Sequence, residues 1–222
     1  MKSGSSTKES STCPRPLHKA SSTIARTVAV IGKRALLQAA EHLTTPFITK
    51  HNRAGKGLGV RLFESTEELR AYIESPSFEE PIDGITLLQQ YIAAPEPFIT
   101  RCEFLGQEFL FAVRVDTSVG FLVCPADDCQ DEDATVCPAT SAAKFEIIED
   151  FSSSLIEDFK KVLVANDIHV AGIEFIVDSA GQAFTYDINT NKNYNTRAET
   201  KVGRSGMGAI AALLQKELAA LE

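Results

Sequence analysis

The sequence predicts an α+β protein built of two lobes. The earlier part of the ordered chain follows a β-α-β-β-α order, whereas the later part consists mostly of antiparallel strands with helices. Between them, residues 75–84 hold two prolines and a glycine, which suits a connection between lobes. Hydrophobic residues make up 44% of the chain and charged residues 23%, so the composition is that of a globular protein with a packed core.

The first lobe is expected to contain three strands and two helices, and a buried strand is expected after the connection at 75–84. Ser65 and Glu68 form a capping box, which predicts that the second helix begins there. The predicted strands are 27–30, 46–50, 60–63 and 85–92, and the predicted helices are 33–42 and 65–74.

The second lobe is expected to begin with a hairpin that turns at Gly106 and Gln107. Leu155, Phe159 and Leu163 share one face of a predicted helix. The predicted strands are 98–104, 109–115, 168–177 and 183–188, and the predicted helices are 154–166 and 207–221.

The N-terminal segment and the net charge bear on the location and the partners of the protein. Residues 1–23 are rich in Ser and Thr and poor in bulky apolar side chains, so we expect a disordered leader. It lacks the apolar segment of a signal peptide, and no run of 18 apolar residues predicts a membrane span, so the expected location is cytoplasmic. The formal charge of −8 argues against nucleic-acid binding, which needs a basic face.

A glycine-rich loop at residues 50–60 is the densest cationic cluster of this acidic chain. Its glycines are Gly55, Gly57 and Gly59, and its cations are Lys50, Arg53 and Lys56. Glycines allow consecutive N–H groups to surround an anion, so the loop suits a polyphosphate. The G-x-G-x-G spacing matches neither the dinucleotide fingerprint nor the P-loop. The alternative is a hairpin tip whose lysines serve solubility.

A second candidate site is an acidic hairpin formed by residues 172–177 and 184–189. If Val177 pairs with Gln182, then Glu174 faces Thr185, and side chains on one side of the sheet include Glu174, Thr185, Asp187 and Asn189. Glu174 and Asp187 would be diagonal neighbours, at about 7–8 Å. Two carboxylates and an amide oxygen suit Mg²⁺. A one-residue bulge would change this geometry, and the alternative is a solvated polar face.

Three cysteines lie in a short acidic segment, at Cys124, Cys129 and Cys137. Three interpretations stay open for them: zinc binding, a redox-sensitive pair and plain loop thiols. The spacing of the three cysteines matches no common zinc pattern. The total of five cysteines is odd, which favours free thiols over a disulfide framework.

The cationic loop and the acidic hairpin, in this order, resemble the ATP-grasp superfamily, and most closely its α-L-glutamate ligase-like members. The resemblance covers about residues 24–221 and includes the Asp187-Ile188-Asn189 motif. It implies lobes at 24–88 and 89–222 that enclose a nucleotide cleft, without the N-terminal α/β domain usual in that family. By this resemblance, Lys50 and Lys56 contact phosphates, and Gln90, Tyr91 and Ile92 line the adenine. Arg101 and Arg114 hold the γ-phosphate or the acyl-phosphate. The implied magnesium ligands are Glu174, Asp187 and Asn189.

The resemblance also implies an activity. A carboxylate would attack the γ-phosphate of ATP to give an acyl-phosphate, and an amine would then displace phosphate to form an amide, with Mg²⁺ or Mn²⁺ neutralising charge. Small molecules or peptides would be the substrates, and a homo-oligomer or another chain could supply the missing domain. Two alternatives stay open, a nucleotide-binding module without catalysis and a small α+β interaction protein.

Overall fold

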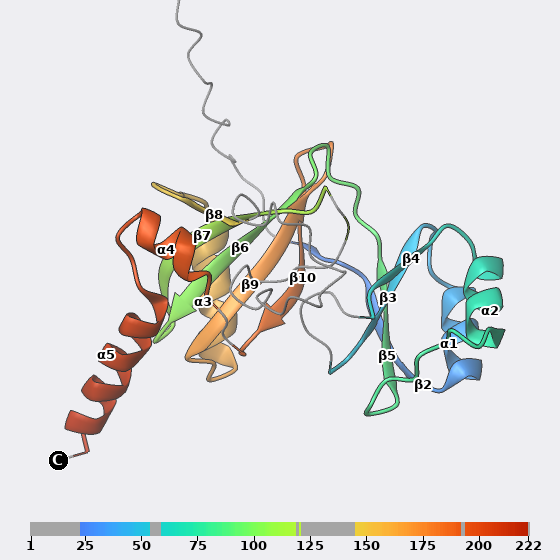
Figure 1. Cartoon of the computed structure of the whole chain (residues 1–222), viewed down its shortest axis with the longest axis horizontal. Coiled ribbons are helices and arrows are strands. Elements are labelled where there is room, and N and C mark those ends of the chain that lie inside the picture. Colours follow the sequence, from blue (N-terminus) through green and yellow to red (C-terminus); the bar gives the residue numbers. More distant parts are fainter. Residues whose placement is uncertain (1–22, 54–58, 119, 121–144, 192–193, 222) are drawn as a thin grey trace, which may run out of the picture.

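The protein was analysed as a computed structural model that describes residues 23–53, 59–118, 120, 145–191 and 194–221. Within these ranges the chain forms two β-sheets, which lie side by side with helices on their outer sides (Figure 1). None of the helices in these ranges has the length and apolar character needed to cross a bilayer.

The first sheet has four antiparallel strands in the order β2-β5-β3-β4. The strands are β2 (Thr27–Ile31), β5 (Ile85–Gln90), β3 (Phe47–His51) and β4 (Arg61–Phe63). Helices α1 (Lys33–Ala40) and α2 (Thr66–Glu74) cover one face, where Leu36, Leu69 and Leu88 are buried. Strand residues of the other parity, among them Ile48 and Lys50, therefore face away from the helices.

The predicted capping box at the start of α2 is present. The Ser65 side chain accepts a hydrogen bond from the Glu68 N–H at 3.2 Å, and the Glu68 carboxylate accepts one from the Glu64 N–H at 2.8 Å.

We expect Ser65→Ala to lower the free energy of unfolding by about 1 kcal/mol, because an N–H of the first turn loses its acceptor. Urea denaturation followed by circular dichroism measures this change. Ser65→Asp keeps an acceptor at the cap and should stay close to the wild type. Equal losses in both variants would show that the cap contributes nothing.

The second sheet has six strands in the order β1-β10-β9-β6-β7-β8, antiparallel except for the parallel pair β1–β10. The strands are β1 (Thr23–Ile24), β10 (Ala183–Asn189), β9 (Val170–Val177), β6 (Phe98–Leu105), β7 (Glu108–Asp116) and β8 (Phe145–Ile148). On one face α3 (Leu155–Ala165) packs on a core that includes Phe104, Phe159 and Phe175.

The opposite face of this sheet carries a second, smaller core and the candidate site. Its apolar part includes Phe111, Val113 and Tyr194, packed beside residues of α4 (Thr196–Lys201) and α5 (Gly206–Ala219). The same face carries the charged residues Arg101, Glu174 and Asp187, and Asp187 lies where the six-stranded sheet meets the four-stranded one.

Most predicted elements are present, with ends that coincide or differ by one or two residues. The sequence analysis missed β1, β8 and α4, which are only two, four and six residues long. The four-stranded sheet continues to Gln90, whereas Thr23 and Ile24 pair with β10 of the other sheet. Thr23 and Ile24, which were expected in the leader and the first lobe, thus belong to the six-stranded sheet. Gln89 and Gln90, which were expected in the second lobe, belong to the four-stranded sheet.

Candidate functional site

The β9–β10 hairpin has a different register from the predicted one. Val177 pairs with Ala183, not with Gln182. The reason lies in the turn, where the Asp178 N–H donates to the Gln182 carbonyl at 3.0 Å and encloses three residues that end in Gly181, with φ of 79°. Such a three-residue turn with a left-handed glycine is a common hairpin connection. The Asp178 carboxylate stabilises it by accepting N–H bonds from Ala180 and Gln182 at 2.9 Å each.

A β-bulge at Tyr186 brings the two acids together despite this shift. Thr185 pairs with Phe175, and the next pair is Asp187 with Glu174, so Tyr186 is the extra residue. Glu174 and Asp187 are therefore direct cross-strand neighbours, closer than the diagonal pair that was predicted. Thr185 is not on their side, because it pairs with Phe175 of the α3 core.

Across the sheet, Arg101 of β6 stands directly opposite Glu174. Its Nη1 lies 3.6 Å from Glu174 Oε1, and its Nε lies 2.7 Å from Glu103 Oε1 on the same strand. Burial disfavours the guanidinium charge, but Glu103 and Glu174 outweigh that effect, so the pKa of Arg101 is raised above its ordinary value. Arg101, Glu174 and Asp187 thus form a charged row over three strands.

Glu174 is held by a second partner, the phenol of Tyr186. The Tyr186 hydroxyl donates a hydrogen bond of 2.8 Å to Glu174 Oε2. Burial raises the pKa of Glu174, the carboxylate of Asp187 raises it further, and Arg101 and the Tyr186 hydroxyl oppose this rise. A second cation near Glu174 and Asp187 would relieve the repulsion between the two carboxylates.

The facing sheet supplies this second cation. Lys50, on the helix-free face of β3, places its Nζ 3.0 Å from Asp187 Oδ1 and 3.4 Å from the Tyr186 carbonyl. Gln89 of β5 donates to the same carbonyl at 3.1 Å. The pairs Lys50–Asp187 and Gln89–Tyr186 join residues 137 and 97 positions apart, and they connect the two sheets.

Arg114 is not brought to this face. Arg114 pairs with Thr100 in the sheet, one position away from the Arg101–Val113 pair, so its side chain projects to the opposite side. There it forms an ion pair of 3.0 Å with Glu96 and stacks on the Phe98 ring at 3.9 Å. Arg114 therefore does not share the face of Arg101, although both residues were expected at one phosphate.

The other predicted nucleotide residues lie at the junction or outside the described ranges. Gln90 ends β5, with its N–H donating to the Arg26 carbonyl at 2.8 Å, and Tyr91 and the buried Ile92 continue from it. Arg53 is exposed at the start of the glycine-rich loop. The predicted residues that lie outside the described ranges are Gly55, Lys56 and Gly57 of the loop, and Cys124, Cys129 and Cys137.

The donor atoms of Glu174, Asp187 and Asn189 fit a hard divalent cation. All three project from one face, since Asn189 pairs with Gly172 two residues beyond Glu174. Their side chains offer carboxylate and amide oxygens, the ligands that Mg²⁺ prefers. Among the described residues, no group of three or more His, Cys, Asp or Glu side chains is arranged to hold a metal, so a site here depends on two carboxylates with the amide.

A small cavity lies beside this row, between the sheet and α4. Its volume is about 30 Å³, enough for one or two water molecules. Arg101 and Glu103 form part of its lining, with Tyr194 and Glu199 on the helix side. Glu199 Oε1 accepts a hydrogen bond from the Gly206 N–H at 2.6 Å, which fixes the junction of α4 and α5.

Glu199 gives a prediction about pH. Burial raises the pKa of this carboxyl, Glu103 raises it further, and the Gly206 N–H opposes the rise. A raised pKa means that ionisation destabilises the folded state, and this penalty grows as pH rises from the ordinary value of 4.5 through the raised pKa. We therefore expect Glu199→Gln to become increasingly more stable than the wild type over that rise in pH. Urea unfolding at several pH values measures it, and a pH-independent difference would contradict it.

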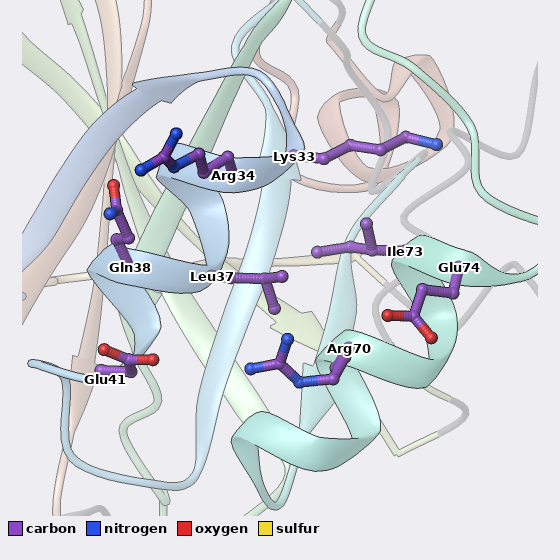
Figure 2. A pocket seen from close by; sticks show the side chains of 8 residues that line it. All are labelled: Lys33, Arg34, Leu37, Gln38, Glu41, Arg70, Ile73 and Glu74. Carbon is purple, nitrogen blue, oxygen red and sulfur yellow. The ribbon is translucent and has the colours of Figure 1, made fainter.

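A much larger hollow, of about 620 Å³, lies elsewhere, between α1 and α2. Figure 2 shows Leu37 and Ile73 between the two helices, with Arg34, Arg70 and Glu41 around them. Because these helices cover the face of the four-stranded sheet opposite to Lys50, this hollow is separate from the charged row.

The sequence analysis missed three residues that hold the site together: Tyr186, Glu103 and Gln89. Tyr186 lies within the predicted strand 183–188, and only the bulge turns it toward Glu174. Glu103 had a signal, because an acid two positions after Arg101 in a strand must share its face. Gln89 shows no sequence signal for its contact with residue 186.

Comparison with known proteins supports the fold. No protein-family model matches the chain. The ATP-grasp ligase PsnB, complexed with a variant of its minimal precursor, Mg and ADP, is similar with a TM-score of 0.56 at 13% identity, over 91% of this chain and 56% of that one. A RimK domain ATP-grasp protein from Sphaerobacter thermophilus DSM 20745 is similar with a TM-score of 0.54 at 15% identity, over 86% of this chain and 60% of that one.

D-cycloserine synthetase DcsG is similar with a TM-score of 0.60 at 12% identity, over 88% of this chain and 65% of that one. The chain therefore spans less than two-thirds of the length of each of these three neighbours. At this identity the similarity concerns the fold, and it agrees with the two sheets and their helices. The chain has the ATP-grasp fold, as its sequence predicted.

Proposed function

We propose that the chain binds ATP with Mg²⁺ where β3 and β10 meet, and that it acts as a ligase that joins a carboxylate to an amine. The observation that carries this proposal is the approach of Lys50 Nζ to within 3.0 Å of Asp187. A cation suited to phosphate and an acid suited to metal belong to different sheets and meet at one point. Metal-bound polyphosphate is the ligand that needs both groups there.

In this proposal each side chain has a distinct task. Lys50 contacts a phosphate oxygen, and Glu174, Asp187 and Asn189 hold Mg²⁺, which neutralises the charge of the phosphates when bound. Arg101, beside Glu174 in the row, stabilises the negative charge that develops on the transferred phosphoryl group. Gln90, Tyr91 and Ile92 are proposed to line the adenine, because they end β5, the strand that pairs with the Lys50 strand β3, and begin the segment that leads to the six-stranded sheet.

The proposed reaction has two steps. A carboxylate oxygen of the first substrate attacks the γ-phosphorus of ATP, and the bond to the β–γ bridging oxygen breaks to release ADP. The amine of the second substrate then attacks the acyl carbon, and inorganic phosphate leaves as the amide forms. Neither step needs a nucleophile from the protein, so alignment and charge neutralisation by the row supply the acceleration.

Peptides are the proposed substrate class, because PsnB was also solved with its precursor peptide PsnA2. Glutamate is one candidate for the added amine. A cytoplasmic location belongs to the same proposal, since an odd cysteine count suits a reducing compartment.

Two measurements test the proposal. Titration calorimetry with ATP, in the presence and absence of Mg²⁺, should show binding that depends on the metal, and no heat in either titration would exclude a nucleotide site. Phosphate release is then measured with a panel of amino acids and carboxylate-bearing peptides. Release that depends on both an amine and a carboxylate is the expected result.

A second candidate function is nucleotide binding without catalysis. It would need only the contact between Lys50 and Asp187 and the proposed metal ligands, without a site for an amine or a carboxylate. In that case ATP would bind with Mg²⁺ but no substrate in the panel would release phosphate.

A further inference from the structure

Arg101 is shared unequally between two glutamates. Its Nε lies 2.7 Å from Glu103 Oε1, while its Nη1 lies 3.6 Å from Glu174 Oε1. The three side chains expose only 16%, 4% and 17% of their surface, for Arg101, Glu103 and Glu174 respectively. Solvent therefore screens neither contact strongly, and the shorter distance identifies Glu103 as the main partner.

The alternative pairing would be favourable if Glu103 were absent. Arg101 and Glu174 are direct cross-strand neighbours, and at this separation a guanidinium can bind a carboxylate with two parallel hydrogen bonds. Such a bidentate pair would occupy the oxygens of Glu174. The Tyr186 hydroxyl already takes one of these oxygens, Oε2. A divalent cation would then have to compete with Arg101 for the other.

The contact of Glu103 with the row is its ion pair with Arg101. Glu103 stands two residues from Arg101 on β6 and pairs with Gly172, which has no side chain, so it does not reach the Glu174–Asp187 pair directly. It is 3% exposed, and a carboxylate buried to that degree requires a cation.

We propose that Glu103 is a positioning residue that holds Arg101 back from Glu174 and so keeps the Glu174 carboxylate available to a divalent cation. The inference rests on the proposed function, because it assumes that Glu174 is a metal ligand. It adds Glu103 as a residue that influences metal binding through the guanidinium of Arg101.

The test measures binding of Mn²⁺ alone to the full chain, by electron paramagnetic resonance of the free ion. In Glu103→Gln the guanidinium loses its charged partner and moves to Glu174, so Mn²⁺ affinity should fall by about 10-fold to 100-fold, the range found for residues behind a metal ligand. Glu199→Gln is the matched control, because it neutralises another buried glutamate on the same cavity that has no ion pair with Arg101. Its Mn²⁺ affinity should equal that of the wild type.

The double variant Arg101→Gln/Glu103→Gln separates positioning from a general structural role. It removes the competitor together with its partner and leaves the net charge unchanged, so Mn²⁺ affinity should return to within about two-fold of the wild type. It also removes both buried charges at once, which protects the fold if the single variant unfolds. A double variant that binds Mn²⁺ ten-fold more weakly than the wild type overturns the proposal.

Failure of this inference and failure of the proposed function give different results. If the wild type binds neither Mn²⁺ nor ATP with Mg²⁺, the site itself is wrong. If the wild type binds both ligands and Glu103→Gln binds Mn²⁺ equally well, only the role of Glu103 is refuted.

Discussion

Asp187→Asn is expected to abolish metal-dependent turnover while the protein stays folded. The substitution keeps the shape of the side chain but removes the charge that faces both Lys50 and Glu174. A loss on the order of 10²–10³ in rate is the expected size for one group that stabilises charge in the transition state. Phosphate release with saturating ATP and Mg²⁺ measures it, and calorimetry should show that ATP binding no longer responds to the metal.

The stability of this variant should change little, and this distinguishes it from a folding defect. The Lys50–Asp187 ion pair is partly exposed, so its loss costs at most about 1 kcal/mol. Against that loss stands the relief of repulsion between Asp187 and Glu174, because like charges directly opposite each other destabilise a sheet. The proposed metal site thus holds two acids in a place where stability alone would favour only one.

The matched control lies at the other end of the same hairpin. Asp178→Asn makes the same chemical change in the turn, where an amide oxygen can still accept the N–H bonds of Ala180 and Gln182. This control should keep the activity of the wild type. Activity that survives in Asp187→Asn, or that disappears equally in both variants, would refute the metal assignment of Asp187.

The sequence allowed most elements of the fold to be predicted, because their periodicity is local. Helix α3 was found from the spacing of Leu155, Phe159 and Leu163, and the start of α2 from the Ser65 cap. Strand β1 was not predicted, because a strand of two residues has no periodicity of its own. It forms by pairing with the edge of β10.

The candidate site illustrates a different limit. The residue types of the acidic hairpin pointed to one face for Glu174 and Asp187, but the predicted register would have required no bulge. The true turn shifts the pairing by one residue, and the bulge at Tyr186 shifts it by one more in the same direction. A total shift of two residues returns Asp187 to the face of Glu174, so the predicted face is correct although the predicted pairs are not. Arg114 had no such shift, so strand alternation carried it to the other face.

Phe175→Ala is expected to have the largest effect on stability. Phe175 is 1% exposed, follows Glu174 on β9, and packs its ring against Phe159 and Phe151 at centroid distances of 6.1 and 6.5 Å. Removing a buried aromatic ring leaves a cavity, and losses of about 3–5 kcal/mol are typical. Thermal and urea unfolding followed by circular dichroism measure this change, and Phe175→Leu, which fills most of the space, should lose clearly less.

The consequence for the site follows from the alternation of strand β9. Phe175 points into the α3 core, so its neighbour Glu174 must point to the opposite face, opposite Arg101 and Asp187. Weakening the core face should therefore loosen the row, and ATP binding with Mg²⁺ should weaken together with stability in Phe175→Ala. In Asp187→Asn metal-dependent binding should be lost while the fold remains. If Phe175→Ala lost stability but kept the wild-type affinity, the packing of α3 would not be what holds Glu174 in place.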